Sequence, residues 1–194
     1  MTDVETLPGC LVITGTPGAG KSTVTQLVAQ RLPRAARLDG DVFARMLVSG
    51  WANKLDEEGH WNPGPEGERQ LRLRTVNVCS AADNFADAGF TPVIELVVES
   101  RQELAFIAGR LRARPLMLVV LCPPLQVALH RNANRPVEDR VDYDFAPLAR
   151  NQRLELGDLG WWLDSGELSA ETTAESIVAE AVERAVITED QLQA

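Results

Sequence analysis

The chain has 194 residues, of which 45% are hydrophobic and 24% charged, and its 19 basic against 28 acidic residues give a formal net charge of −9. This composition excludes a disordered or fibrous chain, and the acidic balance argues against a general binder of nucleic acid or of anionic membranes. We therefore expect one globular domain over residues 1–194, without a nucleic-acid or membrane partner.

The cysteines and the N-terminal segment bear on where the protein works. Cys10, Cys79 and Cys122 lie far apart, in or beside apolar runs, and predict buried free thiols rather than a metal site or a disulfide framework. Residues 1–8 carry no basic stretch, and the longest apolar run is far shorter than a membrane span. These features favour a cytoplasmic protein that is neither exported nor inserted in a membrane.

Short apolar runs alternate with helical stretches along the chain, which predicts an α/β fold with a parallel sheet covered by helices on both faces. The expected strands are residues 10–14, 35–38, 92–98, 115–122 and 161–163. The expected helices are residues 21–32, 42–48, 66–88, 101–112, 124–130, 147–156 and 170–185. Two irregular segments, about 51–65 and 130–145, fit neither pattern, and we expect them to belong to the active site.

The loop after the first expected strand carries a phosphate-binding pattern. Residues 15–22 match G-x-x-x-x-G-K-[ST], between an apolar strand and an amphipathic helix. The glycines let backbone N–H groups surround phosphate oxygens, Lys21 reaches the β and γ phosphates, and the Ser22 hydroxyl coordinates Mg²⁺. We therefore expect ATP and Mg²⁺ as cofactors, bound by Gly15, Thr16, Pro17, Gly18, Ala19, Gly20, Lys21, Ser22 and Thr23.

Two carboxylates follow the second expected strand. Asp39 and Asp41, separated by Gly40, fall at the carboxyl edge of the sheet, where ligands of α/β proteins bind. One carboxylate can accept or orient the proton of an acceptor hydroxyl, while the other holds a metal-bound water. Both are therefore catalytic candidates, and Asp39 is also a metal candidate. The alternative is a turn with a helix cap, for which Asp-Gly-Asp is well suited.

These residues resemble the P-loop small-molecule kinases related to nucleoside monophosphate, shikimate, gluconate and adenylylsulfate kinases. The phosphate loop, the strand ending in aspartate and residues 42–47 look most like chloramphenicol phosphotransferase and tunicamycin-resistance-type proteins. The resemblance implies a three-layer fold with a five-stranded parallel sheet in the order 2-3-1-4-5 and an arginine-bearing lid at about residues 130–145. It puts Asp41 where the family places the carboxylate that activates the acceptor hydroxyl, and Asp39 at the first aspartate of Asp-Gly-Asp. Which aspartate is the base stays open.

The resemblance also suggests roles for two arginines. Arg131 and Arg135 lie four residues apart, which predicts one helix face in the lid. Closed over the nucleotide, both would stabilise charge on the transferring phosphoryl group and exclude water, and Arg131 would also bind the cofactor.

Three further positions are candidates for the acceptor side. Glu95 stands in the third expected strand, where a Walker B strand normally ends in aspartate; it either holds a magnesium-bound water or contacts substrate, and a buried glutamate without a partner is costly. Trp51 and Trp61 suit a sugar, nucleoside or aromatic antibiotic, or else anchor their loop. The last expected strand resembles the one that lies near adenine in related kinases. At most one of Trp161 and Trp162 approaches the adenine there, because neighbouring strand residues face opposite ways.

Residues 53–59 imitate two GTPase motifs, N-K-x-D and D-x-x-G. The motifs share Asp56, occur in the wrong order and lack strands of their own, so we do not predict a GTPase. The resemblance instead implies a Mg-ATP-dependent phosphotransferase for a hydroxyl of an antibiotic, nucleoside or sugar derivative, with a resistance-type kinase favoured. The alternatives are a metabolic kinase of the gluconate, adenylylsulfate or nucleotide type, and a nucleotide-dependent binding or switch protein. Either a monomer or a homodimer is expected.

Overall fold

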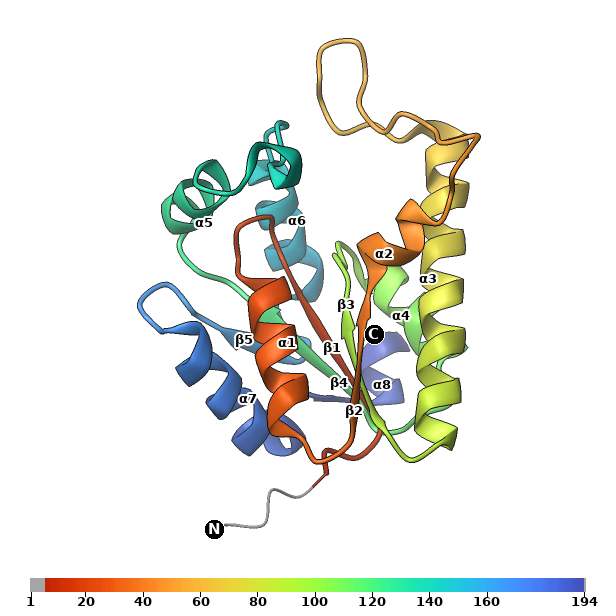
Figure 1. Ribbon diagram of the computed structural model, residues 1–194, viewed down its shortest axis with the longest axis vertical. Coiled ribbons are helices and arrows are strands. Elements are labelled where there is room, and N and C mark those ends of the chain that lie inside the picture. The colour runs from red at the N-terminus through yellow and green to blue at the C-terminus, as the bar shows by residue number, and fades with distance from the viewer. Residues whose placement is uncertain (1–5, 194) are drawn as a thin grey trace.

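The computed structural model describes residues 6–193, so the expectation about residues 1–5 lies outside the described part. A parallel sheet in the order β2-β3-β1-β4-β5 runs through the centre (Figure 1), which confirms the expected α/β fold and strand order. Its strands are β1 (Cys10–Gly15), β2 (Ala35–Asp39), β3 (Thr91–Glu95), β4 (Leu116–Leu121) and β5 (Trp161–Leu163).

Helices cover both faces of the sheet because the central strands are apolar on both sides. Every residue of β1 and β4 is buried. On one face, α1 (Lys21–Arg31) and α7 (Ala170–Arg184) contribute to one core cluster. On the other face, α3 (Gly64–Asp87), α4 (Arg101–Arg110) and α6 (Ala146–Leu156) contribute to a second. The result is the three-layer arrangement seen in Figure 1.

The remaining elements are shorter and lie around this three-layer core. They are α2 (Gly40–Arg45), α5 (Leu125–Ala133), a 3-10 turn (Val137–Asp139), β6 (Val186–Ile187) and α8 (Glu189–Gln193). The pair β6 and α8 was not expected from the sequence. β6 pairs antiparallel with β4 over two residues only, which is too short to leave a periodic signal.

The third strand ends earlier than the sequence predicts, at Glu95 instead of residue 98. In the register of the sheet Glu95 lies opposite Asp39, where β2 also ends, so the chain beyond it has no neighbour on that side. Val98 is nevertheless buried, and its N–H donates to the Thr14 hydroxyl. The apolar residues at 96–98 therefore indicate a buried segment of chain and not a continuation of the paired strand.

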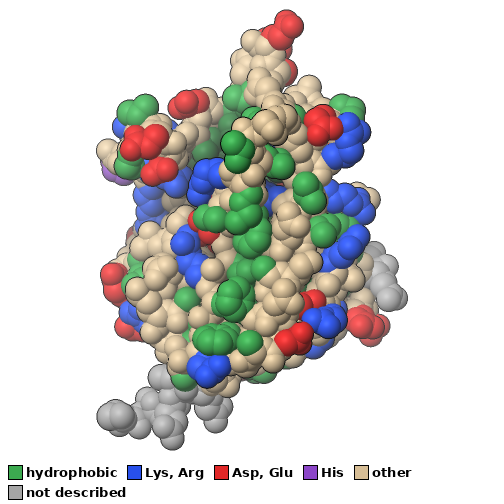
Figure 2. Space-filling model, turned by 45° about the vertical axis from the view of Figure 1, so that its right-hand side comes forward, with side chains coloured by type: hydrophobic (Ala, Val, Ile, Leu, Met, Phe, Trp, Pro, Cys, Tyr) green, Lys and Arg blue, Asp and Glu red, His purple; other side chains and the backbone are tan. Residues whose placement is uncertain are grey.

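Smaller expectations are met in part. Cys10, Cys79 and Cys122 are free thiols, but Cys122 is only partly buried. Among the described helices, none combines the length and apolar character needed to cross a membrane. The segment between α2 and α3 projects from the top of the molecule (Figures 1 and 2), and its tip carries the acidic residues Asp56, Glu57 and Glu58.

Candidate active site at the carboxyl ends of the strands

The phosphate-binding loop is held close to neighbouring backbone. A Cβ at Gly15 would lie 2.4 Å from the Leu121 carbonyl oxygen, and one at Gly18 would lie 2.1 Å from the Ala128 carbonyl oxygen of α5. Gly18 also has φ +76°, a conformation that L side chains rarely adopt. Lys21 folds back over this loop and donates to the Thr16 carbonyl oxygen at 2.9 Å. Burial lowers the pKa of Lys21 to about 8.

A network of side chains joins the phosphate loop to the ends of β2 and β3. The Ser22 hydroxyl donates to Glu95 Oε1 at 2.6 Å. Arg37 Nη2 donates to Glu95 Oε2 at 2.7 Å and to Asp39 Oδ2 at 3.1 Å. Glu95 is thus the last residue of its strand, buried and paired, at the position where a Walker B carboxylate is expected. Arg37 was missed in the sequence, although its spacing of two from Asp39 on a strand indicates that both share one face.

Asp39 and Asp41 have different surroundings. Asp39 is the N-cap of α2, because its Oδ1 accepts a hydrogen bond from the Asp41 N–H at 2.9 Å. The side chain of Asp41 is 74% exposed, and its Oδ1 lies 3.9 Å from Arg74 Nη1 on α3. A Cβ at Gly40 would lie 2.4 Å from Leu96 Cδ2 and 3.1 Å from the Glu95 carbonyl oxygen, so the glycine between the two aspartates leaves room for the Leu96 side chain. The helix-cap alternative therefore describes Asp39, while the carboxylate of Asp41 remains accessible.

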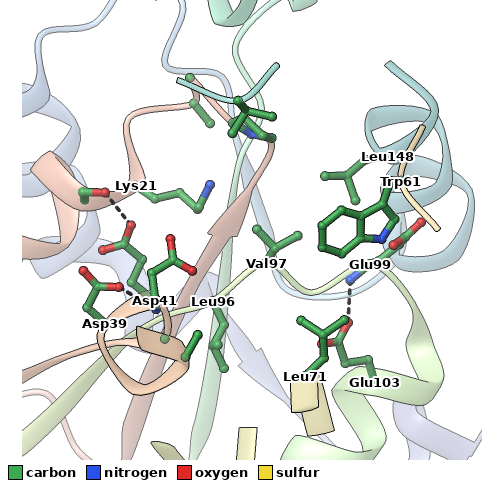
Figure 3. Close-up of a pocket in the computed structure, with 18 of the residues that line it drawn as sticks. Lys21, Asp39, Asp41, Trp61, Leu71, Leu96, Val97, Glu99, Glu103 and Leu148 are labelled. Carbon is green, nitrogen blue, oxygen red and sulfur yellow. Dashed lines mark hydrogen bonds between the residues drawn. The ribbon is translucent and has the colours of Figure 1, made fainter. Parts of the chain in front are cut away.

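A cleft of about 1920 Å³ opens over these strand ends. Figure 3 shows Lys21, Asp39 and Asp41 on one side of it and Trp61, Glu99 and Leu148 on the other, with Val97 between them. Nearly all the predicted site residues line this cleft: Pro17, Gly18, Ala19, Gly20, Lys21, Ser22, Thr23, Asp39, Asp41, Trp51, Trp61, Glu95, Arg131 and Arg135. Gly15 and Thr16 lie in the loop itself but are not among the lining residues.

The two lid arginines do not share a helix face as the sequence predicted. Helix α5 ends at Ala133, so Arg131 stands in its last turn and Arg135 lies beyond its C-cap. Arg131 Nη2 donates to the carbonyl oxygens of Ser165 and Gly166, at 3.0 and 3.3 Å. The spacing of four does not put both arginines on one helix face because the helix stops between them.

Aromatic side chains bring the two irregular segments together over the cleft. The rings of Trp61 and Tyr143 have their centroids 5.2 Å apart, and both residues line the cleft. Tyr143 is the single tyrosine of the chain, and the sequence analysis did not single it out. Trp51 instead stacks against Lys54, whose Nζ lies 3.3 Å from the ring centroid.

The tryptophans of β5 pack away from the cleft. Trp161 is buried, with the Arg184 guanidinium 4.2 Å above its ring. The indole N–H of Trp162 donates to the Leu156 carbonyl oxygen at 2.9 Å. Neither is among the cleft-lining residues described, so both serve packing.

Comparison with protein families gives one match that covers most of this site. The family model described as AAA domain covers residues 11–154. The chain belongs to this family of P-loop kinase domains. An adenylate kinase from Thermococcus sibiricus (strain DSM 12597 / MM 739) is 38% identical over 69 residues, which are 34% of this chain and 35% of that protein. The match thus spans about a third of that relative's length.

Several solved structures share the fold at low identity. A sugar kinase from Janibacter sp. HTCC2649 has a TM-score of 0.62 and 19% identity, over 89% of this chain and 94% of that one. The Deinococcus radiodurans tunicamycin resistance protein has a TM-score of 0.63 and 18% identity, over 94% and 99%. Shikimate kinase from Acinetobacter baumannii, in complex with shikimate, has a TM-score of 0.58 and 21% identity, over 92% and 94%.

The family match thus assigns the chain to its family, and these solved structures share its fold.

Proposed function

We propose that this protein is a Mg²⁺- and ATP-dependent phosphotransferase that phosphorylates a hydroxyl group of a small molecule. The observation that carries the proposal is the position of Asp41, whose accessible carboxylate faces the same cleft as the phosphate loop and Lys21. A base and a nucleotide cradle that share one cleft can hold a hydroxyl in line with a γ-phosphate.

In this proposal Asp41 is the base. It accepts the proton of the acceptor hydroxyl as that oxygen bonds to the γ-phosphorus. The bond from this phosphorus to the β–γ bridging oxygen breaks at the same stage and leaves ADP. Lys21, Arg131 and Arg135 stabilise the negative charge on the phosphoryl oxygens, with Arg131 held in place by the carbonyls of Ser165 and Gly166.

The residues beside the phosphate loop fit Mg²⁺. The Ser22 hydroxyl and the Glu95 carboxylate meet at 2.6 Å, and such hard oxygen donors are the ligands that Mg²⁺ prefers. We assign the metal to Ser22 and Glu95 instead of Asp39, because Glu95 lies within hydrogen-bond distance of Ser22, whereas Asp39 Oδ1 caps the start of α2. When bound, the ion would neutralise charge on the β and γ phosphates. Asp39 then orients the turn that carries Asp41.

In this proposal the acceptor is a small molecule that carries a hydroxyl group. If the acceptor is an antibiotic, its phosphorylation would be a resistance activity. The tunicamycin resistance protein, the sugar kinase and the shikimate kinase have TM-scores of 0.63, 0.62 and 0.58, so structural similarity does not favour one acceptor over another. A second candidate is a nucleotide kinase, which is favoured by the 38% identical segment shared with an adenylate kinase.

The test is phosphoryl transfer followed by ³¹P NMR, with Mg-ATP and a panel of sugars, nucleosides, nucleotides, hydroxy acids and antibiotics. We expect one class to yield a phosphate ester, and Asp41→Asn to lose transfer by about a hundredfold or more while it still binds ATP. The matched control is Asp142→Asn, an exposed aspartate outside the cleft lining. Undiminished transfer by Asp41→Asn would remove the base assignment, and transfer to water alone would support a nucleotide-dependent switch.

A further inference from the structure

Two cations, Arg74 and Lys54, line the cleft on its α3 side, and Arg74 Nη1 lies 3.9 Å from Asp41 Oδ1. Arg74 belongs to this helix, while Lys54 comes from the irregular segment that packs against it. A Cβ at Gly67 would lie 3.5 Å from Lys54 Cγ, so the lysine stem runs over this glycine. Gln70, one turn along, accepts from the Ala52 N–H and donates to the Gly50 carbonyl oxygen. These bonds fix the segment, and with it Lys54, close to Arg74.

The bonding capacity of these cations is largely unused. Lys54 is 9% exposed, and its ammonium rests on the Trp51 ring with one long contact of 3.5 Å to the Ala52 carbonyl oxygen. The side chain of Arg74 is 12% exposed, and its buried Nε has no hydrogen-bond partner among the described residues. Its one ion pair there, with Asp41, is 3.9 Å long and beyond hydrogen-bond distance. Buried donors without acceptors are costly, which indicates that a ligand supplies the missing acceptor.

The neighbouring groups do not supply it. Glu103 of α4 lies near enough for Arg74 to oppose the rise in pKa that burial gives it, but it accepts a hydrogen bond from the Glu99 N–H at 3.0 Å and, among the described residues, none from Arg74. Other arginines of α3 are engaged, since Arg69 bonds to Glu66 and Arg72 lies over the Phe106 ring. The nearness of Arg74 also contributes to lowering the pKa of Lys54, after burial itself. Two cations that repel each other in a partly dry site attract an anion between them.

We propose that Lys54 and Arg74 bind an anionic group of the acceptor, a carboxylate or a phosphate, next to the hydroxyl that Asp41 activates. Both cations line the cleft, and the Arg74 guanidinium lies 3.9 Å from the Asp41 carboxylate, so one small molecule can place its anion at Arg74 and its hydroxyl at Asp41. The guanidinium fork of Arg74 matches two oxygens of such a group, and Lys54 adds a point charge. This inference rests on the proposed function of the cleft. It favours hydroxy acids and phosphorylated sugars or nucleosides over their neutral counterparts.

The first test measures anion binding without turnover. The protein is saturated with Mg²⁺ and a non-hydrolysable ATP analogue, so that added phosphate does not occupy the phosphate loop. Inorganic phosphate and acetate are then titrated while the fluorescence of Trp51, which stacks on Lys54, is followed, with Trp51→Phe as the blank. We expect saturable binding of at least one anion, weakened about tenfold by Arg74→Gln and by Lys54→Gln. The control Arg69→Gln, on the same helix, should bind as the unaltered protein does.

The two anions distinguish the two sources of charge. Saturable phosphate without acetate indicates a phosphorylated acceptor, and the reverse indicates a carboxylate. Lys54→Arg keeps the charge and should retain binding, which protects the test against a variant that merely unfolds. No saturable binding of either anion, or binding by both Gln variants as tight as that by the unaltered protein, would overturn the subsite.

The second test compares phosphoryl transfer to matched pairs, ribose 5-phosphate against ribose and gluconate against glucose. The charged member should be the better acceptor by about tenfold or more, and Arg74→Gln should remove that preference mainly through KM. Anion binding without transfer to any acceptor would count against the proposed function alone. Transfer to neutral acceptors only would count against the subsite alone.

Discussion

At the scale of single residues, Glu95 connects the phosphate loop with the acceptor side of the cleft. One of its carboxylate oxygens accepts from Ser22, and the other accepts from Arg37, which also holds Asp39. Arg37 therefore offsets the cost of a buried glutamate and keeps two carboxylates close together at the strand ends. Among Asp39, Asp41 and Glu95, the accessible carboxylate is that of Asp41, the residue to which we assign proton transfer.

The role of Glu95 can be tested by its amide. Glu95→Gln keeps the size and the contact with Ser22 but removes the charge that holds the metal. We expect the concentration of Mg²⁺ needed for half-maximal transfer to rise by about tenfold or more, with nucleotide binding in EDTA unchanged. The measurement is transfer rate against Mg²⁺ concentration, with Glu155→Gln, another cleft-lining glutamate, as the control. An unaltered Mg²⁺ requirement would return the metal role to Asp39.

At the scale of elements, the phosphate loop is shaped by the helices on either side of it. Helix α1 begins at Lys21, and the loop before it passes close to α5. The Ala128 backbone of α5 leaves no room for a side chain at Gly18. Helix α5 also carries Arg131 in its last turn. The phosphate site and the arginine that is to stabilise the transferred group are thus positioned against each other by one close backbone contact.

Gly18→Ala tests this contact. The added Cβ meets the Ala128 carbonyl oxygen at 2.1 Å and demands φ +76° of a residue with a side chain. We expect a loss of about 2 kcal/mol in the free energy of unfolding and a larger relative loss of nucleotide affinity. The matched control is Gly59→Ala, where φ is +82° but no atom lies within 4 Å. Chemical denaturation and calorimetric ADP binding measure both quantities; equal effects in the two variants would contradict a role for the contact.

At the scale of the whole molecule, the cleft of this acidic protein holds several cations among its carboxylates. The chain has a net charge of −9, yet Lys21, Lys54, Arg74, Arg131 and Arg135 all line the cleft over the carboxyl ends of the strands. Electrostatic attraction between the protein and a charged ligand is local under physiological salt, because screening limits its range to about 8 Å. A polyanionic nucleotide is therefore attracted by the cations nearest its phosphates, and the net charge of the whole chain has little effect on its binding.

Ligand binding should accordingly stabilise the entire chain. A Mg²⁺-bound ATP analogue at about a hundred times its dissociation constant adds about 2.7 kcal/mol to the free energy of unfolding. For a chain of this size, this raises Tm by about 5 to 10 °C. Thermal unfolding followed by circular dichroism measures the shift. Lys21→Ala should show little or none of it; an equal shift in that variant would place nucleotide binding elsewhere.

Several parts of the structure were predictable from local pattern. The alternation of apolar runs and helical stretches indicated the parallel sheet, and the resemblance implied the strand order that is observed. Helix α1 begins at Lys21, within the phosphate-loop motif. These features are set by neighbours in the chain, whose periodicity and turn chemistry act over a few residues.

Other parts depend on contacts between distant segments. The end of β3 at Glu95, the split of Arg131 and Arg135 by the end of α5, and the roles of Arg37, Arg74 and Tyr143 were wrongly predicted or missed. A strand ends where its partner ends, and an arginine gains its role from the carboxylate it faces. Neither the end of a strand nor the partner of an arginine can be predicted from the residue spacing within a single segment.

The sequence by itself determined the fold class and the phosphate-binding loop, because short-range patterns encode both. Only the tertiary structure decided which acid joins Ser22, which aspartate stays accessible and which cations lie beside it. Those choices arise where β2, β3, α3 and the segment before α3 meet, and the free energy of a charged side chain there depends on burial and on partners far away in the sequence.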